Sequence, residues 1–300
     1  MKSPVWSKTI LACGALGMLV ITGCGPRPIA NADDLHSSES EPTALETVSS
    51  TGTATADSRP AKNSDDTQAA LSDSRDLLQQ GLRKLADREG YAATFFKQEE
   101  VSGELLPEEV IDLKVRQNPF SIYMDWRDSN QEIAYIDGQN DNKVAVRPTG
   151  LKGVFGAVQL DPDSNLIMQS SRYPITTVGL AELSRRLIEY RQRDLTRGVG
   201  VVCSKEADQQ CGERDCFQYV LSYASPAVDP DYSRSIVLID KQSLLPVCVT
   251  NYGWPVPADD SSAGEPEAGL IEHYAYKDLR FDVKLTDDDF QIQSRKVARQ

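Results

Sequence analysis

Two neighbouring segments of the 300-residue chain decide its fold: Val110-Ile-Asp-Leu-Lys-Val-Arg116 and Phe120-Ser-Ile-Tyr-Met-Asp-Trp126. Apolar and polar side chains alternate in both. Because successive side chains of a β-strand point to opposite faces of a sheet, this period of two predicts two strands, each with one buried face. The apolar set, which we expect on the concave side of the sheet, is Ile111, Leu113, Val115, Phe120, Ile122, Met124 and Trp126.

Further strand-like runs lie on both sides of these two segments. They are Tyr91–Glu100, Glu132–Asp137, Lys143–Arg147, Gly198–Ser204, Cys216–Tyr223, Arg234–Asp240, Pro246–Tyr252 and Ile271–Asp282. Many short runs of this kind, separated by turn residues such as Asp137-Gly138, predict antiparallel strands.

Two amphipathic segments predict helices. In the first, Leu77, Leu78, Leu82 and Leu85 recur at helical spacing, and Gly90 follows as a stop signal. The second spans Val178–Arg193. Strands with a few helices predict an α+β fold. We expect a strongly curved antiparallel sheet, an incomplete barrel, with the N-terminal helix and the second helix packed on its concave face.

The first residues have the features of a bacterial lipoprotein signal. Lys2 and Lys8 precede an uncharged apolar stretch that is too short to span a membrane, and the stretch ends at Gly23-Cys24. We expect cleavage after Gly23 and lipidation of the Cys24 thiol, which would hold the protein on a membrane facing the periplasm. Gly25 weakly favours the outer membrane over the inner one.

Composition divides the rest of the chain. Residues 24–70 are rich in Ser, Thr, Ala, Asp and Glu and lack aromatic residues, so we expect a disordered tether after the signal peptide at 1–23. Residues 71–297 are long enough for one domain with a substantial core. The formal net charge of −13 argues against a nucleic-acid partner, because phosphates require a basic surface.

Four cysteines remain in this domain: Cys203, Cys211, Cys216 and Cys248. Export makes them candidates for disulfides. We expect Cys203 to pair with Cys216 or Cys211, because Cys216 and Cys248 should lie two strands apart. We expect no bound metal, since the sequence has no CxxC pair and the domain has one histidine, His273.

No catalytic motif stands out. The chain lacks a nucleophile elbow, a P-loop, a dinucleotide fingerprint and an HExxH motif. A hydrolase would depend on His273, in a strand-like run, or on carboxylates that nothing singles out. We therefore assign no catalytic residue and no cofactor.

Several stretches taken together resemble a known family. They are Tyr91–Glu99, Lys114–Trp126, Tyr135–Asp141, Ser171–Thr176, Asn251–Pro255 and Tyr274–Leu279. In this order they resemble the exported bacterial proteins called domain of unknown function 1571, from about Leu77 to Phe290. More distantly, the helix–strand opening resembles the lipoprotein carriers LolA and LolB. That resemblance implies an incomplete barrel around an apolar cavity for acyl chains, and no catalytic residues.

Three functions follow as hypotheses. In the first, the sheet binds a lipid, acyl chain or other apolar ligand, and the seven apolar residues of the two deciding segments line its cavity. In the second, the domain is an envelope structural or sensory protein with a filled core that binds another protein. In the third, which the sequence favours least, it is a hydrolase. A cavity would favour the first hypothesis, and a filled core with an exposed apolar patch would favour the second. A cleft joining His273 to a Ser and an Asp would favour the third.

Overall fold

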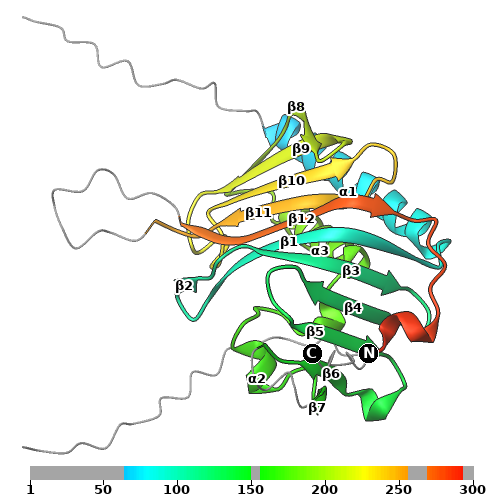
Figure 1. Ribbon diagram of the computed structural model, residues 1–300. Coiled ribbons are helices and arrows are strands. Elements are labelled where there is room, and N and C mark those ends of the chain that lie inside the picture. Colours follow the sequence, from blue (N-terminus) through cyan, green and yellow to red (C-terminus); the bar gives the residue numbers. More distant parts are fainter. Residues whose placement is uncertain (1–63, 150–155, 256–268, 293–300) are drawn as a thin grey trace, which may run out of the picture. The chain divides into compact units, whose positions relative to one another are not determined.

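The computed structural model (Figure 1) describes residues 64–149, 156–255 and 269–292. The signal segment, Gly23, Cys24 and most of the expected tether lie outside the described residues. Within them, one antiparallel sheet and the helices α1 and α3 form the domain. No helix of this part of the chain is long and apolar enough to cross a membrane.

The sheet is built from twelve strands, and each strand pairs antiparallel with its neighbours. The strands are β1 (Gly90–Val101), β2 (Glu104–Leu105), β3 (Glu109–Arg116), β4 (Ser121–Trp126), β5 (Glu132–Ile136), β6 (Val144–Arg147), β7 (Val158–Leu160), β8 (Val201–Cys211), β9 (Arg214–Tyr223), β10 (Arg234–Asp240), β11 (Pro246–Tyr252) and β12 (Leu270–Arg280). Their order is β7-β6-β5-β4-β3-β1-β12-β11-β10-β9-β8, with β2 paired to β1. Because β7 and β8 end this order without pairing to each other, the sheet stays open. This confirms the expected incomplete barrel.

The two long helices pack on one face of the sheet, as expected. The first helix, α1 (Ser64–Ala86), contacts α3 (Leu180–Arg197) and β8. The backbone N–H of Leu180, at the start of α3, donates to the hydroxyl of Tyr91 in β1 at 2.8 Å. Gly198, at φ +71°, ends α3 in the left-handed conformation that glycine favours. Short helical turns complete the domain: η1 (Asn140–Asn142), α2 (Asn165–Met168), η3 (Ile175–Thr177) and η4 (Asp287–Phe290).

The first helix begins earlier than the sequence predicts. Its start at Ser64 places the expected boundary between residues 70 and 71 inside α1. Asp65 and Asp66 stabilise its first turn against the helix dipole, and Leu71 is fully buried. Gly90 does not stop this helix. It opens β1, where a Cβ atom would lie 2.3 Å from the backbone oxygen of Val115.

The alternation that decides the fold is confirmed in β3 and β4. Leu113 pairs with Met124 and Val115 with Ile122, and all four side chains are at most 4% exposed. Ser121 is also buried, although it belongs to the opposite face. The reason is local: the Arg116 guanidinium donates to its Oγ at 2.8 Å, and Arg116 is itself covered by η4.

The four cysteines of the described residues, Cys203, Cys211, Cys216 and Cys248, form no disulfide with one another. Cys203 lies in the core opposite Leu221, away from the expected partners. Cys211 instead shares a hydrogen bond with Cys248, which lowers the pKa of the Cys211 thiol. In the β8–β9 register Cys216 is opposite Gln209, six residues along β8 from Cys203 (209 minus 203), or roughly 20 Å. This is well beyond the distance of about 7 Å between Cα atoms that a disulfide can span.

Candidate binding cavity

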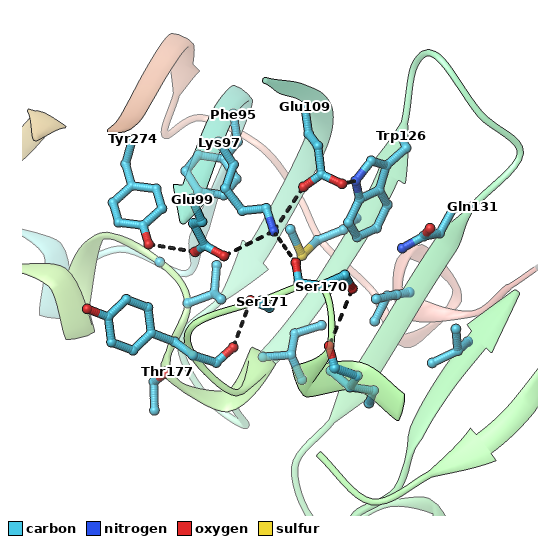
Figure 2. A pocket seen from close by; sticks show the side chains of 18 of the residues that line it. Phe95, Lys97, Glu99, Glu109, Trp126, Gln131, Ser170, Ser171, Thr177 and Tyr274 are labelled. Carbon is cyan, nitrogen blue, oxygen red and sulfur yellow. Dashed lines mark hydrogen bonds and ion pairs between the residues drawn. The ribbon is translucent and has the colours of Figure 1, made fainter. Parts of the chain in front are cut away.

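A cavity of about 490 Å³ lies between one end of the sheet and the first half of α3 (Figure 2). Strands β1, β3 to β7 and β12 supply one wall, and α2, η3 and the start of α3 supply the other. Most of its lining is apolar: Phe95, Met124, Trp126, Ile133, Val146, Val158, Leu160, Leu166, Ile167, Ile175, Val178 and Leu183. Its volume falls within the range of about 300–1,000 Å³ typical of ligand sites.

The seven residues proposed from the sequence as lining are distributed over three environments. Met124 and Trp126 line this cavity. Val115 and Phe120 line a second, smaller cavity of about 300 Å³. The remaining three, Ile111, Leu113 and Ile122, are at most 1% exposed and belong to the packed core.

Apolar side chains extend from the cavity to the surface. Leu166 of α2 is 62% exposed and Val158 of β7 is 46% exposed, and both line the cavity. Large apolar side chains are rarely left in water without a role when they are contiguous with other apolar surface. These two residues therefore mark an apolar mouth.

One wall of the cavity carries charge. Figure 2 shows Lys97 of β1 between two carboxylates. Its Nζ lies 2.9 Å from Glu109 and 3.4 Å from Glu99, and it donates to the Ser170 backbone oxygen at 3.2 Å. Trp126 Nε1 donates to the second oxygen of Glu109 at 2.9 Å. This lysine is therefore fully engaged by the protein's own acceptors.

Behind this wall lies a second buried carboxylate, Glu272 of β12, which pairs across the strands with Glu99. It accepts hydrogen bonds from Asn251 at 2.7 Å, Tyr232 at 2.9 Å, Tyr173 at 3.0 Å and Tyr274 at 3.2 Å, and it forms an ion pair with Arg172. Burial, followed by the charge of Glu272, raises the pKa of these three tyrosines. Their hydroxyls therefore remain protonated donors, and the network holds the polar wall in place.

The sequence contains a signal for this polar wall, but a search for alternating apolar residues does not detect it. Lys97 and Glu99 follow Phe95 at steps of two in β1, so the strand must carry a lysine and a carboxylate on its buried face. Buried charges require partners. For Lys97 the partners are Glu109 and the Ser170 backbone oxygen. For Glu99 they are also the Arg172 backbone N–H and the Tyr274 hydroxyl, from segments distant in the sequence.

His273 does not take part in the cavity. It follows Glu272 in β12, so its side chain lies on the other face, where its Nδ1 is 2.9 Å from the Thr250 hydroxyl. Burial lowers its pKa. A triad built on His273 would therefore lie away from the cavity.

The structure is similar to solved structures that include MucB, a mycobacterial lipoprotein and a LolA superfamily protein. MucB aligns over 74% of this chain and 64% of its own, less than two thirds, at 10% identity and a TM-score of 0.41. Lipoprotein LppX of Mycobacterium tuberculosis aligns over 72% and 99% of the two chains at 11% identity and a TM-score of 0.39. A LolA superfamily protein from Nitrosomonas europaea aligns over 73% and 97%, at 10% identity and a TM-score of 0.21.

At the sequence level, no curated protein matches the chain. Residues 88–298 match the family described as protein of unknown function, DUF1571. This range includes every strand of the sheet and the whole cavity lining. The chain therefore belongs to the DUF1571 family.

Proposed function

We propose that this protein binds a lipid acyl chain, or another apolar ligand of that shape, in the cavity beneath the sheet. The observation that carries the proposal is the cavity of about 490 Å³ with an apolar lining and an apolar mouth. A protein-binding domain with a filled core would not need such a void, because close packing stabilises an interior. Lys97 forms ion pairs with Glu99 and Glu109, so these three charges are paired with one another. The apolar residues of the lining can then contact a hydrocarbon chain.

The proposal includes a membrane anchor. The segment ending at Gly23-Cys24 supports export and attachment of a lipid to Cys24. An anchored protein with an acyl-chain cavity would hold its ligand close to the membrane surface from which lipids come.

Replacing Cys24 with alanine is expected to move the protein from the membrane fraction to the soluble fraction, because the thiol is the atom that carries the lipid. Fractionation and the intact mass of the purified protein measure this. Persistence of the variant in the membrane fraction with an unshifted mass would contradict the anchor.

Filling the cavity tests the ligand. Val146→Trp and Met124→Trp each place an indole in the lining, and binding of the neutral dye 1-N-phenylnaphthylamine should weaken by about tenfold or more. Displacing two buried methylene groups is sufficient for that, at about 0.8 kcal/mol each. Val202→Trp makes the same change at a position that is 45% exposed and outside the cavity, so its binding should stay unchanged.

Circular dichroism and thermal unfolding of the three variants separate loss of binding from loss of fold, because overpacking can cost about 1–3 kcal/mol. If the wild-type protein does not bind the dye, or if all three folded variants bind it equally, the cavity is not a ligand site.

A further inference from the structure

Arg186 differs from the other cations around the cavity. It lies on α3 and lines the cavity, and its guanidinium lies over the Tyr173 ring at 3.9 Å from the ring centre. Among the described residues it forms no hydrogen bond and no ion pair. By contrast, Lys97 has two carboxylates and a backbone oxygen, and Arg172 has Glu272 and the Glu100 backbone oxygen.

The same contrast holds along α3. Arg185, next to Arg186 in the sequence, forms an ion pair with Glu182. Arg191 donates to Ser74, and Arg193 forms ion pairs with Asp194 and Asp229. Arg186 is therefore the arginine of this helix that forms no hydrogen bond or ion pair with any described residue, and it lines the cavity of about 490 Å³. Stacking on Tyr173 fixes the plane of the guanidinium without using its N–H groups.

An open guanidinium in a partly buried site favours an anion. Its fork of N–H donors matches a carboxylate or phosphate, and it is weakly hydrated. Two carboxylates line the same cavity, Glu99 and Glu109, but both are already held by Lys97, and by Tyr274 or Trp126 as well. Neither carboxylate forms an ion pair with Arg186.

We propose that the ligand is an amphiphile with a single anionic headgroup, a carboxylate or a phosphate, which Arg186 binds while the chain occupies the apolar part of the cavity. This inference rests on the proposed function. It narrows the ligand from any apolar molecule to fatty acids and lipid phosphates.

The test compares three ligands with the same chain and different headgroups: dodecanoate, dodecyl phosphate and dodecanol. Each displaces 1-N-phenylnaphthylamine from the protein. The wild type should bind the two anions about tenfold to a hundredfold more tightly than the alcohol, as expected for hydrogen bonds to a charged group. The better of the two anions identifies the headgroup class.

Arg186→Met should abolish the preference for anions, so that both anions bind this variant no more tightly than dodecanol binds the same variant. Arg186→Lys should restore part of the preference, since a point charge replaces the fork. Arg83→Met is the matched control, because it removes the same charge from an exposed position on α1.

Two results overturn this inference: equal binding of the three ligands by the wild type, or an anion preference that survives Arg186→Met. Retained dye binding in that variant shows that it is folded. If the wild type binds neither the dye nor any of the three ligands, the proposed function itself fails, which is a distinguishable result.

Discussion

Replacing Glu272 with alanine is expected to lower the free energy of unfolding by about 3–5 kcal/mol, as for other buried ion-pair networks that lose one partner. Glu272 is 3% exposed and accepts from Asn251 and three tyrosines beside the ion pair with Arg172. The substitution leaves Asn251, Tyr232 and Tyr173 without their carboxylate acceptor. Tyr274 keeps Glu99 and Arg172 keeps the Glu100 backbone oxygen. Buried donors without their acceptor lose their hydration in folding and gain nothing in return.

Urea unfolding at pH 7 measures this loss. Glu272→Gln keeps the shape but turns an amide N–H₂ toward donors, so it should also destabilise the protein, by less than the alanine variant. Glu104→Ala removes the same charge from an exposed position in β2 and should change the free energy of unfolding by about 0.5 kcal/mol or less. A Glu272→Ala protein as stable as this control would show that the network contributes no stability.

The strands and helices could be predicted because their signals are local. The alternation in Ile111–Val115 and Ile122–Trp126 follows from which side chains face the core, and the β3–β4 register places the apolar residues of the two strands opposite one another. The leucines of α1 and α3 are at helical spacing for the same reason. An open sheet with both helices on one face is then the arrangement that buries all of these faces together.

The cavity could not be placed in this way. Periodicity says that Leu113 and Met124 share a face, but Leu113 is packed in the core while Met124 borders empty space. The helical segments that face Met124 across the cavity are α2, η3 and the start of α3, and their positions depend on contacts between distant parts of the chain. The sequence does not distinguish Arg186 for a similar reason, because on an amphipathic helix it is typical of a surface arginine. Only the fold shows that no described residue forms a hydrogen bond or ion pair with it.

The glycine in the middle of α1 is a further feature that helical spacing leaves unexplained. Gly81 lies among the leucines that predict the helix, where glycine is less favourable than alanine by about 1 kcal/mol. The structure gives the reason. A Cβ atom at Gly81 would lie 2.0 Å from the backbone oxygen of Leu244 and 2.5 Å from its carbonyl carbon, in the turn between β10 and β11.

The same turn is held to α1 by a second contact, because Lys84 Nζ donates to the backbone oxygen of Gln242 at 3.0 Å. Leu244 itself has φ +61°, so the turn backbone has little freedom to move away. Helix propensity and packing therefore predict opposite signs for the same substitution at Gly81, and the short distance to backbone atoms decides between them.

Gly81→Ala is accordingly expected to destabilise the protein by roughly 3 kcal/mol or more, as severe overpacking does, although it improves the helix propensity. The control is the neighbouring exposed position, where Gln80→Ala should be more stable than Gln80→Gly by about 1 kcal/mol. Chemical unfolding of the three variants and the wild type measures both differences. If alanine stabilised the protein at position 81 as it does at position 80, α1 would not approach the β10–β11 turn as closely as the structure places it.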